Sequence, residues 1–167
     1  NISFTSNTEI YKQMENEMKK GNKEKIQELF FELTPRVQEN VEDVIEKFKD
    51  YGLTLDNYIP ACIKQSSLFR SSSDSIEKNV KGIVEKFKDN GLTLNNYIPC
   101  CTKKPQLFYQ SPETIESNVK DLVDKFKDNG LTLDNYISCC IKQPPLFCLS
   151  PETLESNVKG LVDKFKD

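Results

Sequence analysis

The chain has 167 residues, of which 37% are hydrophobic and 29% are charged, with a net charge of -3 and no histidine. The absence of histidine excludes Cys/His metal sites and Cys–His nucleophile pairs, and no apolar run approaches the roughly 18 residues of a membrane-spanning helix. The charge is not that of a strongly basic nucleic-acid-binding protein, but a local basic stripe can bind nucleic acid whatever the whole-chain charge is.

A 39-residue period organises the chain, because Asn40, Asn79, Asn118 and Asn157 begin successive copies of one pattern. A fixed period between about 20 and 50 residues is typical of a solenoid, in which each unit buries its apolar face against its neighbours. We therefore predict an all-α fold, a right- or left-handed α-solenoid of 39-residue helix–turn–helix repeats. The predicted divisions of this one continuous solenoid are residues 1–39, 40–78, 79–117, 118–156 and 157–167.

The first division, residues 1–39, reads as a divergent repeat that caps the N-terminal end. It predicts a polar amphipathic helix over 8–20, a stop at Gly21-Asn22 and a second helix over 23–33. End repeats of solenoids are atypical because one of their faces meets water. The last division, residues 157–167, begins a fourth repeat and stops in the middle of it, so we expect the chain to be a fragment of a longer protein.

Each full repeat predicts a long helix followed by a glycine stop. In the long helix that starts near Ser111 and leads into the copy at Asn118, this serine is a suitable N-cap and Pro112 suits the first helical position. Apolar residues then follow at helical spacing, at Ile115, Val119, Leu122, Val123 and Phe126. The following Asn-Gly pair ends the helix, since glycine readily adopts the left-handed conformation of a helix C-terminus.

A short helix and a proline-marked tight turn complete the repeat. Thr132 caps the short helix, Pro144-Pro145 stops it, and Leu146-Phe147 forms a turn against the core. The charges on the preceding long helix are expected to pair locally, Glu116 with Lys120 and Asp121 with Lys125.

Six cysteines are present, and five of them fall in two adjacent columns of the repeat. Adjacent cysteines on a helix point about 100° apart, unlike the Cys-x-x-Cys clamp of a zinc site. We expect Cys62, Cys101 and Cys140 to be small buried residues of a protein in a reducing intracellular compartment. No metal or other cofactor is expected.

The sharpest difference between the copies falls directly after the repeated Leu-Phe. The residue pairs there are Arg70-Ser71, Tyr109-Gln110 and Cys148-Leu149, with Phe31-Glu32 in the capping repeat. Modular nucleic-acid readers vary in this way, changing one or two side chains per repeat on a fixed scaffold. Drift of exposed loops, or recognition of a protein, is the alternative explanation.

A lysine column recurs at the end of the short helix, at Lys64, Lys103 and Lys142, with no acid at helical spacing on the same helix. The negative end of the helix dipole is a sufficient structural reason for a lysine there. If the three lysines line one edge of the solenoid, they form a ladder for backbone phosphates.

The repeat as a whole resembles the mTERF family of helical repeats. The resemblance is carried by Pro105-Gln106-Leu107-Phe108, Ser111-Pro112, Gly130-Leu131-Thr132 and Pro144-Pro145-Leu146-Phe147, and it covers residues 40–167. It implies a solenoid of two helices and a turn that binds nucleic acid, chiefly duplex DNA, in transcription or RNA handling. More distantly, the variable pair is similar to that of TAL-effector repeats, in which such a pair reads one base per repeat.

Two functions remain open from the sequence, and neither is enzymatic. The first is a nucleic-acid-binding protein, with DNA favoured over RNA, in which Lys64, Lys103 and Lys142 contact phosphates. Its base contacts are Arg70, Ser71, Tyr109, Gln110, Cys148 and Leu149; arginine can pair with guanine, glutamine with adenine, and tyrosine can stack. The second is a protein–protein interaction solenoid, such as a bacterial effector scaffold, which the acidic pI favours.

An enzyme is not expected, because no glycine-rich phosphate loop or paired-carboxylate arrangement is found. No catalytic residue, membrane partner or small-molecule substrate is therefore predicted. An organelle, a bacterial cytoplasm and a host cell all remain possible locations.

Overall fold

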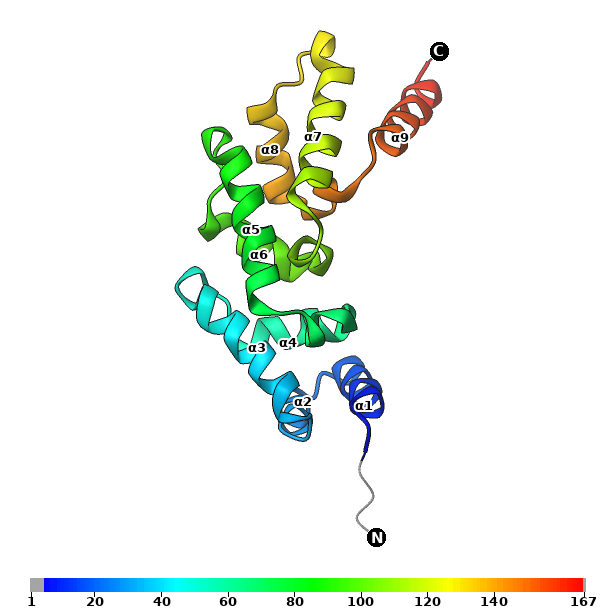
Figure 1. Ribbon diagram of the computed structural model, residues 1–167. Coiled ribbons are helices and arrows are strands. Elements are labelled where there is room, and N and C mark those ends of the chain that lie inside the picture. Colours follow the sequence, from blue (N-terminus) through cyan, green and yellow to red (C-terminus); the bar gives the residue numbers. More distant parts are fainter. Residues whose placement is uncertain (1–4, 167) are drawn as a thin grey trace. The chain divides into compact units, whose positions relative to one another are not determined.

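A computed structural model describes residues 5–166, and all regular structure within that range is helical (Figure 1). The predicted all-α class is confirmed. The chain divides into two compact units, Asn1–Lys78 and Asn79–Asp167, with the boundary inside one helix.

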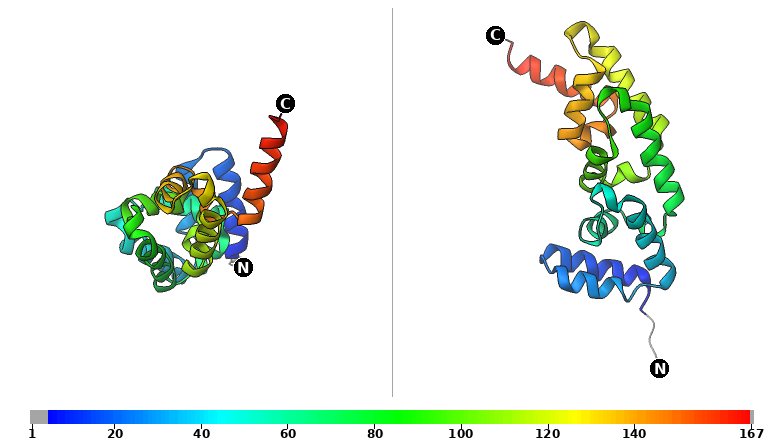
Figure 2. Two further views of the ribbon diagram at one scale, coloured as in Figure 1. Left: turned by 90° about the horizontal axis from the view of Figure 1, so that it is seen from above. Right: turned by 90° about the vertical axis from the view of Figure 1, so that its left-hand side faces the viewer.

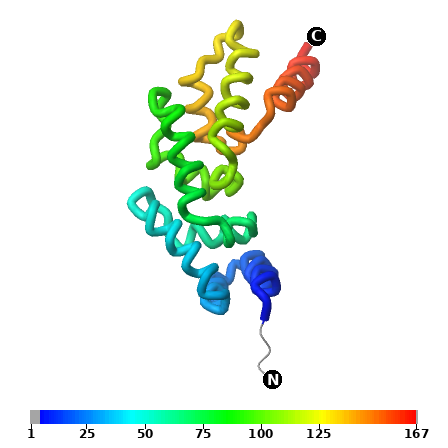
Figure 3. The backbone as a smooth tube through the Cα atoms, in the orientation of Figure 1, coloured from blue at the N-terminus to red at the C-terminus, as the bar shows by residue number. Residues whose placement is uncertain are grey.

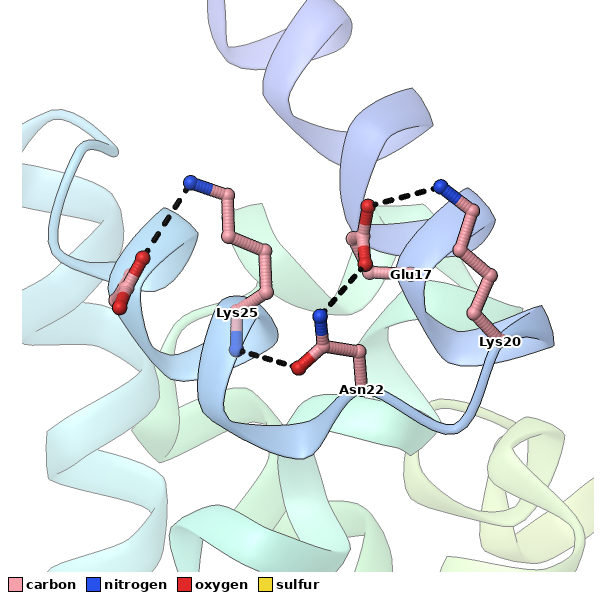
Figure 4. Close-up of polar contacts among 5 residues, drawn as sticks. Glu17, Lys20, Asn22 and Lys25 are labelled. Carbon is pink, nitrogen blue, oxygen red and sulfur yellow. Dashed lines mark hydrogen bonds and ion pairs between the residues drawn. The ribbon is translucent and has the colours of Figure 1, made fainter.

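The first unit begins with a pair of antiparallel helices. They are α1 (Asn7–Lys19) and α2 (Lys23–Phe30), and they lie side by side (Figure 2). Gly21 makes the turn between them with a positive φ of 73°. Figure 4 shows how the turn is held: Glu17 bonds the Lys20 ammonium and the Asn22 amide, while Asn22 Oδ1 accepts from the Lys25 backbone.

The rest of the first unit follows the predicted order of long helix, short helix and turn. The elements are α3 (Pro35–Phe48), the 3₁₀ turn η1 (Lys49–Tyr51), α4 (Leu55–Lys64), η2 (Ser66–Arg70) and the start of α5 (Ser73–Phe87). The predicted tight turn after the short helix is thus a 3₁₀ helix. Its Leu68 and Phe69 are buried, as expected of a turn packed on the core.

The second unit continues the same order through two further short helices. Its elements after α5 are η3 (Lys88–Asn90), α6 (Leu94–Lys103), η4 (Pro105–Phe108), α7 (Pro112–Phe126), η5 (Lys127–Asn129), α8 (Leu133–Lys142), η6 (Pro144–Cys148) and α9 (Pro151–Lys164). The long helix α7 and the short helix α8 lie side by side, as the tube in Figure 3 also shows.

The ends of these helices form for the reasons that the sequence predicts. Ser111 Oγ accepts from the Thr114 backbone N–H at 3.2 Å, and Pro112 occupies the first helical position. Gly52, Gly91 and Gly130 follow the long helices with φ between 88° and 92°, a region that glycine enters without steric cost.

The core of each unit is made by apolar faces of its helices, except that Val158, Leu161 and Val162 of α9 are exposed. Its long-helix members in α3, α5 and α7 are Val37, Val41, Val44, Phe48, Ile76, Val80, Ile83, Phe87, Ile115, Val119 and Leu122. Cys62, Cys101 and Cys140 are fully buried among them, as predicted. Burial raises the pKa of the Cys140 thiol to about 12, so it stays protonated and behaves as an apolar side chain at neutral pH.

Candidate nucleic-acid interface

The variable pair lies where the 3₁₀ helix after each short helix ends. Arg70 is the last residue of η2 and Cys148 the last of η6, while Tyr109 directly follows η4. Arg70 is exposed and the Tyr109 side chain is 40% exposed, whereas Cys148 is half-buried. The first residue of the pair is thus open to a ligand in two of the three repeats.

The second residue of each pair turns partly into the protein. Ser71, Gln110 and Leu149 are all half-buried. Ser71 Oγ donates to the carbonyl oxygen of Ser67 at 3.0 Å, which fixes the turn locally. A base contact by Ser71 therefore competes with a hydrogen bond of the turn.

Gln110 and Cys148, from successive turns, lie against each other in the second unit. The Cys148 thiol donates to Gln110 Oε1 at 3.4 Å, and Gln106 Nε2 donates to the same oxygen at 3.3 Å. Burial raises the pKa of the Cys148 thiol, with Lys104 opposing the shift, so the thiol remains a donor at neutral pH. The structure thus brings together two predicted site residues, with the Gln110 carbonyl oxygen already engaged.

The turns that carry Arg70 and Tyr109 are each held by a contact that sequence reasoning missed. The Tyr11 ring of α1 stacks on Phe69, next to Arg70, with ring centroids 4.2 Å apart. Asn79 Nδ2 donates to the Tyr109 carbonyl oxygen at 3.1 Å. The recurrence of asparagine at the start of each copy was the available signal for the second contact.

The three lysines of the predicted phosphate column are the last residues of α4, α6 and α8. Lys64, Lys103 and Lys142 are all exposed, and none forms a hydrogen bond or ion pair with the described residues. Because α6 and α8 contact each other, Lys103 and Lys142 end neighbouring helices within the second unit. Their ammonium groups are therefore available to an anion.

Lysines near the ends of the long helices behave differently, because each reaches an acid on the following long helix. The Nζ–Oε distances are 3.3 Å for Lys47–Glu77, 3.4 Å for Lys86–Glu116 and 2.8 Å for Lys125–Glu155. The predicted Glu116–Lys120 pair is also present, at 3.3 Å. The local partner predicted for Lys125, Asp121, is replaced by Glu155, since packing brings that carboxylate within hydrogen-bonding distance. These lysines hold helices together within each unit.

One further cationic residue, Arg36, was not singled out by sequence reasoning. It lies in the first turn of α3 and lines a cavity that Arg70 also lines. The available signal was compositional, because these are the two arginines of the chain.

Within residues 5–166, no group of three or more Cys, Asp or Glu side chains is placed to hold a metal ion. None of the helices in the same range is both long and apolar enough to cross a membrane.

Comparison with known proteins adds one result to this geometry. A family model described as mTERF matches residues 11–167, a range that starts inside α1 and covers most of the first unit and all of the second. Neither the curated proteins nor the solved structures gave a match. The chain therefore belongs to the mTERF family, a family of helical-repeat proteins associated with nucleic-acid binding.

Proposed function

We propose that this chain binds nucleic acid, with DNA favoured over RNA, through the lysine column and the variable turn residues. The observation that carries the proposal is the contrast between two sets of lysines at the same repeat spacing. Lys47, Lys86 and Lys125 are neutralised by acids on the next long helix, whereas Lys64, Lys103 and Lys142 have no such partner among the described residues.

The lysine column supplies affinity in this proposal. Each lysine that neutralises a phosphate releases condensed counterions, so it contributes about -0.9 to the slope of log K against log salt on duplex DNA. Three such contacts predict a slope of about -2.7. The overall charge of -3 does not oppose this, because the attraction depends on the local charge at the lysine column.

The turn residues supply preference among sequences. Arg70 is exposed and can donate two hydrogen bonds to guanine, and the exposed Tyr109 ring can stack on an unpaired base. Gln110 must release Cys148 before it pairs with adenine, and Ser71 must release its turn carbonyl. Cys148 and Leu149 offer apolar contact with a thymine methyl.

Fluorescence titration of duplex DNA, single-stranded DNA and RNA at low and moderate salt tests the proposal. The test variant is Lys64→Ala/Lys103→Ala/Lys142→Ala. A matched control removes the same charge at the same spacing. It replaces with alanine three lysines that each form an ion pair with the acid three residues earlier: Lys49, Lys88 and Lys127.

The column variant is expected to lose most of the salt-dependent affinity, with its slope moving toward zero by about 2.7, while the control keeps its slope. The absence of salt-dependent binding to all three nucleic acids refutes the proposed function. Equal weakening in the two triple variants shows that net charge alone, and not the column, is responsible.

A second function, protein–protein interaction, is favoured by apolar surface in the first unit. An apolar cavity of about 130 Å³ is lined by α1, α2 and α4, with Ile26, Leu55 and Ile59 among its walls. Phe31, the residue that follows α2, is 61% exposed. This alternative predicts that partners captured from a nuclease-treated lysate are lost with Phe31→Ser but retained by the lysine-column variant. The opposite pattern favours nucleic acid.

We also infer that the protein works in a reducing compartment. All six cysteines are free, although several lie together in the second unit, and three are fully buried. Free thiols in such numbers persist where glutathione and thioredoxin keep them reduced.

A further inference from the structure

A cavity of about 320 Å³, lined mostly by polar residues, lies in the first unit at the start of α3. It is lined by Asn7, Thr34, Arg36, Val37, Asn40 and Arg70. The described lining residues include two arginines, two asparagines and a threonine, and none of them carries a carboxylate. The cavity therefore offers several hydrogen-bond donors and a net positive charge in a protein that is acidic overall.

Both arginines of the chain line this one cavity, although they are 34 positions apart in sequence. Arg36 comes from the first turn of α3 and Arg70 from the end of η2. Neither forms an ion pair with a carboxylate of the described residues, whereas most lysines of the long helices do. Two arginine side chains that line one cavity without a carboxylate partner among the described residues make the cavity suited to an anion.

The later repeats do not carry these arginines. The positions that align with Arg36 are Ser75, Thr114 and Thr153, and those that align with Arg70 are Tyr109 and Cys148. Thr114 and Thr153 serve there in hydrogen bonds at the start of their helices. The arginine pair is thus a departure from the repeat, and packing of the repeat does not explain it.

The cavity wall is braced by contacts within the first unit. Asn7 Nδ2 donates to Thr34 Oγ1 at 3.1 Å, and the Thr34 backbone N–H donates to Asn7 Oδ1, also at 3.1 Å. This pair joins the start of α1 to the start of α3. On the other side, the Tyr11–Phe69 stack fixes the turn that carries Arg70. The partial positive charge at the N-terminus of α3, a 14-residue helix, adds to the attraction for an anion.

We propose that this cavity binds a phosphomonoester, such as the 5′-phosphate of a mononucleotide or of a nucleic-acid strand end. The charge match favours this group: two guanidinium groups carry two positive charges, and a phosphomonoester carries about 1.5 to 2 negative charges near pH 7. An internal phosphodiester carries one. The arginine fork also matches phosphate oxygens bidentately. Only the extension to a strand end rests on the proposed nucleic-acid function.

Calorimetric titration of the full chain in phosphate-free buffer tests the cavity directly. The probes are adenosine 5′-monophosphate and inorganic phosphate, with adenosine as the ligand that lacks the phosphate. Arg36→Gln and Arg70→Gln are each expected to weaken binding of both phosphate probes tenfold or more. Lys49→Gln, which removes the same charge outside the cavity and at no proposed binding residue, is expected to leave it unchanged. Circular dichroism checks the fold, and Arg70→Lys provides a second variant that keeps the charge but loses the bidentate geometry.

Two results overturn the inference. One is that neither phosphate probe binds saturably up to about 10 mM, the range of weak anion sites. The other is that the affinity survives in both Arg36→Gln and Arg70→Gln. Equal affinities for adenosine and its monophosphate likewise overturn the inference, because the phosphate then contributes nothing to binding.

A pair of oligonucleotides separates this inference from the proposed function. The two strands share one sequence and differ only in a 5′-phosphate or a 5′-hydroxyl. A tenfold preference for the phosphorylated strand that disappears in Arg36→Gln supports the strand-end form. If no oligonucleotide binds but the monophosphate does, the proposed function fails and the cavity stands. If both strands bind equally and the monophosphate does not bind, the cavity inference fails and the proposed function stands.

Discussion

Replacing Gly82 with alanine should destabilise the second unit, although alanine is the better helix former. Gly82 lies inside α5, and a Cβ atom there meets the Pro112 ring at the start of α7, 2.6 Å from Cγ and 3.3 Å from Cβ. The ring cannot swing aside as the end of a long side chain does. The helices must therefore shift to admit the methyl group.

The size of the effect follows from two opposing contributions. Alanine gains up to about 1 kcal/mol over glycine in a helix interior, while overpacking of this kind costs about 1–3 kcal/mol. The expected net loss in the free energy of unfolding is about 1 kcal/mol, which corresponds to a fall of about 0.5 M in the urea midpoint for an m-value of ~2 kcal/mol/M.

Gly160 provides the matched control, because it occupies the same position two repeats later and a Cβ atom there meets nothing within 4 Å. Gly160→Ala should stabilise α9 by up to about 1 kcal/mol, measured as slower amide hydrogen exchange in that helix. Urea denaturation followed by circular dichroism measures Gly82→Ala, alone and with Pro112→Ala, which removes the closest ring atom. The reasoning is refuted if Gly82→Ala raises the urea midpoint, or if its penalty is unchanged in the Pro112→Ala background.

Three further predictions concern ionisation and hydrogen bonding. Burial raises the pKa of Glu116, but hydrogen bonds from two lysines outweigh this effect and hold the pKa below its ordinary value. The resulting stability is present above about pH 4.3 and is lost as the pH falls through the lowered pKa. Glu116→Gln should therefore destabilise the protein at pH 7 and lose less stability than the wild type between pH 7 and pH 3, and equal losses would contradict this. Tyr136→Phe removes a 3.1 Å hydrogen bond to a carbonyl of η6 and should cost about 1 kcal/mol in urea denaturation; an unchanged midpoint would show that the bond contributes nothing net. Cys139 is the exposed cysteine, whereas burial raises the pKa of neighbours such as Cys100 to about 11, so mass spectrometry after brief alkylation at pH 8 should find Cys139 modified first. Equal labelling of the buried thiols would mean that the second unit opens on the labelling timescale.

The helices could be predicted closely because their ends depend on local chemistry. Each short helix begins at a threonine whose hydroxyl faces the third helical residue, an asparagine that bonds back to the threonine backbone. Thr132 and Asn135 form such a box, with 2.9 Å between the Thr132 N–H and Asn135 Oδ1. Caps, glycine stops and apolar periodicity are all readable within four residues, so the predicted and observed bounds nearly coincide.

The partners of the surface charges could not be predicted as well, because they depend on packing. Sequence reasoning paired Lys125 with Asp121, four residues away, and the observed partner is Glu155, thirty residues away. The same limit applies to Gln110, whose contact with Cys148 bridges two repeats. The variability of a position among the repeats does not predict whether its side chain is exposed. The second residues of the variable pairs are half-buried.

The repeat separates its cations into those that build the scaffold and those that remain available. At every 39-residue step, one lysine forms an ion pair with an acid on the next long helix. Its replacement should lower the free energy of unfolding. The lysines that end the short helices form no such ion pair with the described residues, and interact only weakly with the helix dipole. Arg36 and Arg70 are also not required by the scaffold, because the later repeats fold without an arginine at either position. Both of them line one cavity. Cations that the fold does not require are the ones whose loss should change binding and leave the urea midpoint unchanged, so measuring both quantities on each variant distinguishes scaffold from site.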